Sequence, residues 1–276
     1  MSPAGARWSA RLVLLLGFAF LYLPIASLMA SSFNASRLAT VWSGFSLRWY
    51  GELLRDGSLL AAAWVSLKVA FWTANTALVL GTMAALVLTR MRRFRGRTLF
   101  AALVTAPLVM PDIIIGLSLL LLFVAVGGVL GSAPHGAIPI WLAHTTFTLG
   151  FVSVLVSSRL QELDPALEEA AMDLGAGPVR TFFQVTLPVI APAMVAAWLL
   201  AFTLSLDDVV IASFVAGPDA TTLPVKVFSS VRMGLSPKIN ALATLMMVGV
   251  SLLAALAWGW RARSERHQRM THIGPA

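Results

Sequence analysis

Six long apolar stretches constrain the fold of this sequence more than any other feature. They cover approximately residues 11–31, 60–89, 98–125, 139–158, 191–216 and 240–260. A helix that crosses the hydrocarbon core of a bilayer needs about 20 apolar residues, and each stretch is long enough. Charged residues make up 12% of the chain, whereas they make up about 25% of an ordinary soluble domain. We therefore predict an all-α membrane protein with six transmembrane helices, forming a single domain over residues 1–276.

Arginine and lysine are distributed unevenly over the predicted loops. If the N-terminus is cytoplasmic, the cytoplasmic segments carry 13 basic residues and the external loops carry six. Cytoplasmic loops of membrane proteins are enriched in basic residues, so we expect both termini and segment 161–190 in the cytoplasm. The net charge of +8 then follows from topology, and nucleic-acid binding is not expected. The first stretch also resembles a signal peptide, but its apolar run exceeds the length of about 7–15 residues typical of one, which favours a retained helix.

The sequence lacks the motifs of several enzyme classes. A chain that hydrolyses ATP for transport needs a Gly-x-x-x-x-Gly-Lys-Ser/Thr loop, and none of the three lysines follows a glycine. There is no cysteine and the four histidines are scattered, so no metal site is predicted. We therefore expect no enzyme activity and no cofactor in this chain, with any ATP and Mg bound by a separate subunit.

Segment 161–190 carries local signals for two short helices joined by a turn. Asp164 followed by Pro165 is a typical helix start, because the carboxylate can accept a backbone N–H and proline has none to satisfy. Gly175 and Gly177 can adopt the left-handed conformation that ends a helix, and Pro178 can begin the next one. The first helix is predicted to have an apolar face and an acidic face, formed respectively by Leu163, Leu167, Ala170, Ala171 and Leu174, and by Glu168, Glu169 and Asp173.

The spacing in this segment matches a known motif. Glu169-Ala170-Ala171, then Gly175, then Val185-x-Leu187-Pro188 resembles the EAA loop of permease subunits of ATP-binding-cassette (ABC) importers, with valine where that family often has isoleucine. The resemblance implies a cytoplasmic coupling loop that docks on ABC ATPase subunits. The alternative is an ordinary amphipathic loop between two spans. The residues that the resemblance assigns to ATPase coupling are Glu169, Ala170, Ala171, Asp173, Gly175, Leu187 and Pro188.

The resemblance extends over nearly the whole chain. Segments 45–56, 105–123, 199–217 and 221–245 are similar to the polyamine branch of these permeases. This implies the type I (MetI-like) importer fold, in which a core of five of the six helices packs against a homologous second permease subunit to form a heterodimer. It also implies a periplasmic polyamine-binding protein and a location in the bacterial inner (cytoplasmic) membrane. The implied function is import of polyamines, with putrescine as the expected substrate and spermidine as the alternative.

Four ionisable residues within the predicted spans are candidate functional residues: Lys68, Asp112, Asp207 and Asp208. Such residues are costly in a bilayer and usually face a cavity or a partner. At about 1.5 Å per residue, all four fall in the outer half of the membrane. We expect the three aspartates to form a cation-accepting substrate path, with Lys68 as their charge partner. Trp198 and Phe202 are also expected in this path, because aromatic faces attract cations.

Two other interpretations of these charged residues stay open. The first is a structural salt bridge between Lys68 and one of the aspartates. The second is an ion relay in a secondary transporter that is powered by an ion gradient instead of ATP.

Overall fold

The computed structural model describes residues 3–37, 41–91, 93–132, 135–217, 220–232, 237–249 and 251–252. Regular structure in these residues is helical, apart from one antiparallel bridge between Asn34 and Phe45. The chain forms two compact units, one of residues 58–229 and one of residues 1–57 with 230–276.

Within the described residues, five helices are long and apolar enough to cross a membrane, which confirms the prediction of an all-α membrane protein. They are Arg11–Ser31, Gly57–Arg90, Asp112–Val129, Ile138–Glu162 and Pro178–Asp207. The predicted sixth span, 240–260, is helical over 237–249, and residues 253–260 lie outside the described residues. The arginine-rich segment after it also lies outside them.

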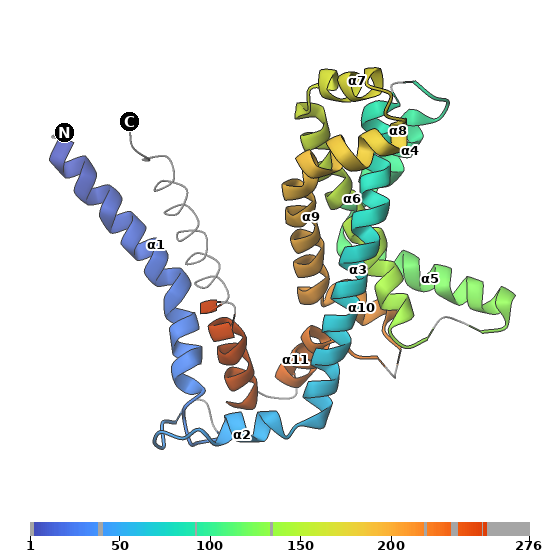
Figure 1. Cartoon of the computed structure of the whole chain (residues 1–276). Helices are drawn as coiled ribbons and strands as arrows, with labels where there is room; N and C mark the ends of the chain where they lie inside the picture. The colour runs from blue at the N-terminus through green and yellow to red at the C-terminus, as the bar shows by residue number, and fades with distance from the viewer. Residues whose placement is uncertain are drawn as a thin grey trace, which may run out of the picture. The chain divides into compact units, whose positions relative to one another are not determined.

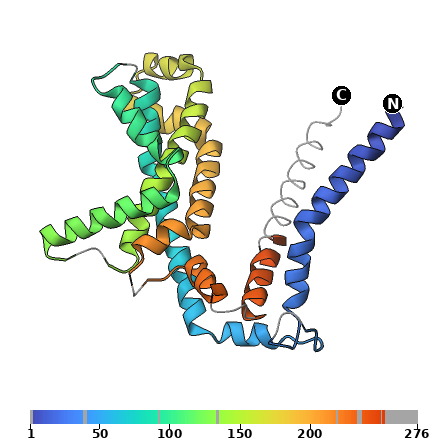
Figure 2. The same ribbon diagram turned by 180° about the vertical axis from the view of Figure 1, so that it is seen from behind.

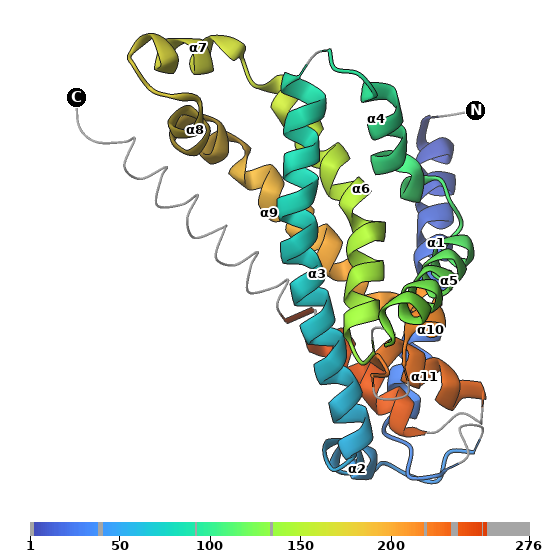
Figure 3. The same ribbon diagram turned by 90° about the vertical axis from the view of Figure 1, so that its right-hand side faces the viewer.

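Three long helices form the centre of the larger unit: α3 (Gly57–Arg90), α6 (Ile138–Glu162) and α9 (Leu187–Asp207). They lie side by side in Figures 1 and 3. In lipid, helices associate by close packing, which small side chains permit. A Cβ atom added to Gly81 of α3 would lie 2.7 Å from Cγ1 of Val152 on α6. Apart from Leu160, the fully buried side chains where the three helices meet are small or β-branched for the same reason, and they include Ala74, Ala77, Val152, Val156, Ala197 and Ala201.

The predicted third span, 98–125, is not one continuous helix in the structure. It consists of α4 (Arg97–Thr105), a 3₁₀ turn η1 (Ala106–Leu108) and α5 (Asp112–Leu130). Pro111 precedes α5 in an extended conformation, with φ −59° and ψ 137°. Proline lacks the N–H that would continue the first helix, and it also restricts the residue before it. As a result α5 extends away from the α3, α6 and α9 bundle in Figures 1 and 2.

The predicted fifth span, 191–216, begins earlier and ends earlier in the structure. A continuous helical segment runs through α8 (Pro178–Thr181), the π-helical turn η2 (Phe182–Thr186) and α9. Pro188 has no N–H to bond the carbonyl of Gln184 in the preceding turn, which fits the irregular winding at η2. The helix stops at Asp207, and a short helix, α10 (Val210–Val215), follows.

Two further helices complete the larger unit. The coupling segment contributes α7 (Pro165–Asp173), which lies with α8 at one end of the α3, α6 and α9 bundle in Figure 3. After α10, the chain continues to α11 (Leu223–Arg232), where the N–H of Leu223 donates to Oγ of Ser66 on α3 at 2.8 Å.

The smaller unit contains α1 (Pro3–Ser31), α2 (Arg48–Leu54) and the helix at 237–249. Asn34, just after α1, is 2% exposed. Its side-chain oxygen accepts from the N–H groups of Ser36 and Ser43 at 3.1 and 3.0 Å, and its amide donates to the carbonyl of Val41 at 2.8 Å. Nε1 of Trp49, on α2, donates to the Asn34 carbonyl at 2.7 Å. This asparagine therefore organises the loop between α1 and α2.

Candidate functional site

The helix α7 begins and ends as its sequence predicts. Oδ1 of Asp164 accepts from the N–H of Ala166 at 3.0 Å, and Pro165 occupies the first turn. Gly175 has φ +89°, the left-handed conformation that ends the helix. Gly177 does not share this conformation: its φ is −70°, and it caps α8, which begins at Pro178. The chain thus reverses between α7 and α8 at one glycine.

The apolar and acidic stripes predicted for α7 do not correspond to a buried face and an exposed face. In the apolar stripe, Leu174 is 90% exposed and Leu167 is 49% exposed. In the acidic stripe, Glu168 has a side chain that is only 18% exposed. The reason lies in the neighbouring elements, since α3 and η2 present a guanidinium and a hydroxyl to α7, and these attract a carboxylate.

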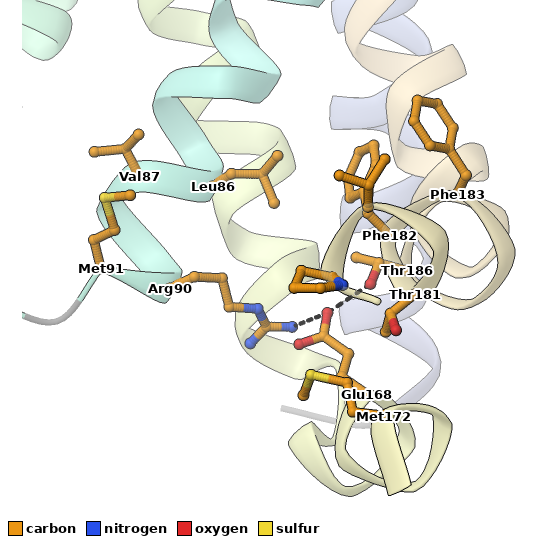
Figure 4. Close-up of a pocket in the computed structure, with 12 residues that line it drawn as sticks. Leu86, Val87, Arg90, Met91, Glu168, Met172, Thr181, Phe182, Phe183 and Thr186 are labelled. Carbon is orange, nitrogen blue, oxygen red and sulfur yellow. Dashed lines mark hydrogen bonds and ion pairs between the residues drawn. The ribbon is translucent and has the colours of Figure 1, made fainter. Parts of the chain in front are cut away.

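Glu168 connects three elements through one carboxylate oxygen. Its Oε1 accepts from Nη2 of Arg90, the last residue of α3, at 2.9 Å. The same atom accepts from Oγ1 of Thr186 in η2 at 2.6 Å. Figure 4 shows the two contacts converging on Glu168. Because the Arg90 and Glu168 side chains are 31% and 18% exposed, the pair is only partly shielded from solvent. We call these three residues the α7 latch.

An open groove of about 580 Å³ lies beside the α7 latch. Figure 4 shows methionine, leucine, valine and phenylalanine side chains along it, with the ion pair on one side. The groove is therefore apolar, with a single charged position. It is lined by Leu86, Val87, Arg90, Met91, Glu168, Met172, Pro178, Val179, Thr181, Phe182, Phe183 and Thr186.

The residues that the EAA resemblance assigns to coupling lie mostly on the surface. Ala171 and Leu187 are partly buried. The exposed ones are Glu169, Ala170, Asp173, Gly175 and Pro188. This placement leaves them accessible to another chain, and their role in coupling stays a prediction.

The three aspartates do not gather around Lys68. Lys68 is exposed on α3, with its Nζ 5.1 Å from the centre of the Trp64 ring, and the described residues contain no ion pair between it and an aspartate. Asp112 is exposed in the first turn of α5, where it is the first residue of the span Asp112–Val129. Asp207 is exposed at the end of α9, whereas the side chain of Asp208 is 7% exposed. The two adjacent acids therefore occupy different environments.

The partner of Asp208 is His144, which our sequence analysis missed. His144 lies on α6 and is 0% exposed. Its Nε2 is 3.2 Å from Oδ2 of Asp208, and its Nδ1 is 2.7 Å from Oγ of Ser205 on α9. A signal was present in the sequence, because a histidine within a predicted span is itself an ionisable residue in the membrane. We had grouped it with the scattered histidines.

Asp208 also begins the next helix. Its carboxylate accepts from the N–H groups of Ile211 at 3.3 Å and Ala212 at 2.7 Å, which would otherwise have no partner at the start of α10. This cap explains why α9 does not continue to residue 216. The break at Asp208 and the contact with His144 are therefore parts of one arrangement.

A serine, a histidine and an aspartate in contact also occur in hydrolases, but this group cannot act as one. A nucleophilic serine must be reached by a substrate carbonyl and activated by the adjacent histidine. Ser205 is 4% exposed and His144 is fully buried. The network therefore has a structural or positional role.

Trp198 and Phe202 are engaged with each other and with α3. Their rings stack with centroids 5.2 Å apart, and Trp198 meets the edge of Phe71 at 6.2 Å. Both are partly buried and pack against the core between α3, α6 and α9. Neither ring contacts a cation in the described residues, so their place in a substrate path stays a prediction.

The chain matches a family described as "Binding-protein-dependent transport system inner membrane component" over residues 77–269. Among solved structures, its fold is similar to a bacterial ABC transporter that imports alginate, with a TM-score of 0.73, 16% identity and coverage of 94% of this chain and 95% of that one. It is also similar to the MetNI methionine ABC transporter, with a TM-score of 0.61, 18% identity and coverage of 80% and 99%.

Two curated relatives from Escherichia coli strain K12 are more similar in sequence. The putrescine transport system permease protein PotI is 59% identical over 262 residues, which cover 95% of this chain and 93% of PotI. The spermidine/putrescine transport system permease protein PotC is 42% identical over 251 residues, which cover 90% of this chain and 91% of PotC. The chain therefore belongs to the family of binding-protein-dependent transport system inner membrane components, as an ABC importer permease of the polyamine branch.

Proposed function

We propose that this chain is the permease subunit of an importer that carries putrescine into the cytoplasm. The observation that carries the substrate assignment is the 59% identity to PotI over 95% of the chain. The complete transporter would contain a homologous second permease, ABC ATPase subunits and a periplasmic polyamine-binding protein. The chain would lie in the bacterial inner membrane with both termini in the cytoplasm, as the basic residues predict.

A single helical segment would connect the ATPase to the substrate path. Pro178–Asp207 contains 30 residues in continuous helix, a length of about 45 Å at 1.5 Å per residue. Its first residue, Pro178, lies within the predicted coupling loop, 161–190, and its last is the exposed Asp207. The α7 latch fixes α7 to η2 within this segment and to the end of α3. A displacement of α7 by the ATPase would therefore reach both helices.

Asp207 is suited to accept an ammonium group. It lies at the C-terminal end of α9, where the helix dipole carries partial negative charge that favours a cation. It forms no ion pair within the described residues and is exposed, so its carboxylate is available. Asp112, by contrast, lies in the first turn of α5, where the partial positive charge of the helix dipole does not favour a bound cation. We therefore assign the main cation contact to Asp207.

Uptake of labelled putrescine into proteoliposomes tests this function. With the ATPase, second permease and binding protein present, Asp207→Asn should raise the KM or lower the rate about 10- to 100-fold, which corresponds to one charge-assisted contact. Asp208→Asn should instead reduce the amount of folded protein, because Asp208 caps α10 and holds His144. Unchanged uptake in Asp207→Asn would argue against a role for this carboxylate.

The same assay separates the alternatives. Competition by spermidine against labelled putrescine decides which polyamine is preferred, a comparison motivated by the 42% identity to PotC. Uptake driven by a pH gradient without ATPase subunits would refute the ATP-driven function and favour an ion-gradient transporter.

A further inference from the structure

His144 holds the break between α9 and α10 from the opposite helix. It lies on α6, while both of its partners belong to the chain around the break: Ser205 in the last turn of α9 and Asp208 immediately after it. All three residues are buried: the side chains of His144 and Asp208 are 0% and 7% exposed, and Ser205 is 4% exposed. The contact therefore joins two helices where one of them ends.

The direction of each contact follows from the protonation state of the two groups. With Asp208 ionised its carboxylate can only accept, so Nε2 of His144 then carries a proton and donates to it. In the neutral ring Nδ1 then accepts, and the Ser205 hydroxyl donates to it. With the N–H groups of Ile211 and Ala212, the Asp208 carboxylate receives three donors. The Asp208 carboxylate is therefore occupied by hydrogen bonds within the protein, whereas the exposed Asp207 carboxylate can accept a hydrogen bond from a ligand.

These contacts determine where the neighbouring acid lies. Asp207 is the last helical residue and Asp208 has an extended backbone, with φ −65° and ψ 130°. A break one residue earlier would leave Asp207 outside the helix, so its side chain would lose the direction that the helical backbone gives it, about 100° around the axis from its neighbours. The position of Asp207 thus depends on the residue after it being held in place.

We propose that His144 is a positioning residue for Asp207: by binding Asp208 and Ser205 it fixes the end of α9 and keeps the Asp207 carboxylate exposed. The statement that Asp207 then meets a cationic substrate rests on the proposed function. The statement that His144 sets the accessibility of residue 207 does not.

The absence of cysteine from the sequence provides a direct test. Asp207→Cys introduces a single thiol, and the rate at which the membrane-impermeant cationic reagent MTSET labels it reports its accessibility in the assembled transporter. Two further substitutions separate the contacts of His144. His144→Gln places an amide near the position of Nε2 and keeps the contact with Asp208, whereas His144→Asn places one near Nδ1 and keeps only the contact with Ser205.

We expect the Gln variant to label the thiol at residue 207 within about threefold of the native background, and the Asn variant to change the rate about tenfold or more, the factor that corresponds to one lost charge-assisted contact. Ser205→Ala loses the same contact with Nδ1 as the Gln variant does, so it should change the rate by a similarly small factor, up to about threefold, without touching either aspartate. It still tests the proposal if the Asn variant does not assemble, because a change of about tenfold or more would contradict the main role of the Asp208 contact. Arg55→Cys, an exposed position at the end of α2, serves as the control and should label equally in every background.

If the thiol at residue 207 is labelled at the native rate in the His144→Asn background, the proposal is overturned. His144 would then contribute only to the packing of the core. Labelling requires no substrate, so this result is independent of the proposed function. If the labelling changes as expected but the native transporter does not carry putrescine, the positioning role stands and the substrate assignment fails. If both hold, His144→Asn should raise the KM for putrescine more than it lowers the maximal rate.

Discussion

Removal of the Glu168 carboxylate should release α7 from the helices that it contacts. Glu168→Ala deletes the shared acceptor for Arg90 and Thr186. A hydrogen bond to a charged group contributes about 1.5–3 kcal/mol when buried, and partial exposure of this pair reduces its contribution. We therefore expect a total loss of about 1.5–3 kcal/mol in the free energy that holds α7 in place. At about 1.4 kcal/mol per factor of ten, α7 would open roughly 10- to 100-fold more often.

Hydrogen exchange measured by mass spectrometry on peptides covering α7 detects this opening. Glu169→Ala is the matched control, because it removes a carboxylate from the same helix at an exposed position. Exchange in α7 should accelerate in the Glu168 variant and stay near the native rate in the Glu169 variant. Equal exchange in the two variants would show that the α7 latch contributes nothing and would refute the reasoning.

A double-mutant cycle isolates the ion pair from other effects. If Arg90 and Glu168 act as one unit, the double variant Arg90→Ala with Glu168→Ala should lower the free energy that holds α7 in place by less than the sum of the losses in the two single variants. Additive costs would mean that the contact seen at 2.9 Å has no energetic coupling. In the assembled transporter, a released α7 should lower the amount of putrescine moved per ATP hydrolysed.

Two further substitutions test packing and loop structure. Gly150→Ala would place a Cβ 2.7 Å from the carbonyl oxygen of Val104, and it should lower the free energy of unfolding by about 1–3 kcal/mol, seen as a lower melting temperature. Gly128→Ala is the control: its Cβ would have nothing within 4 Å, so the melting temperature should be unchanged or slightly higher. An equal drop in both variants would contradict the packing argument. Asn34→Ala removes three side-chain hydrogen bonds and should expose Trp49, which would shift the tryptophan fluorescence to the red. Asn34→Asp keeps the accepting oxygen and should shift the spectrum less. An unshifted spectrum in Asn34→Ala would show that Asn34 does not organise the loop.

The membrane class and the local form of the coupling loop could be predicted because their causes are local. The length of an apolar run decides whether it can cross a bilayer, whatever it packs against. Asp164 caps α7 through an N–H only two residues away, and Gly175 takes its left-handed turn without help from another helix. Such signals need no knowledge of the partner elements.

The faces of α7 and the ends of the broken spans could not be predicted in this way. Periodicity shows which residues share a face of a helix, but not what lies opposite that face. Glu168 turns inward because Arg90, 78 residues earlier in the chain, ends α3 beside it. The sequence pattern around Glu168 is therefore typical of an exposed position, whereas in the structure its side chain is partly buried against Arg90.

The sequence by itself determined that this chain is a helical membrane protein and indicated, through the EAA spacing, an importer permease, because apolar length, helix caps and that spacing are properties of short segments. The tertiary structure alone decided which of two adjacent aspartates remains exposed. His144 and Asp208 are 64 residues apart, and only the packing of α6 against α9 brings them together. Their contact occupies one carboxylate and leaves Asp207 accessible, a distinction that depends on long-range contacts and not on residue type.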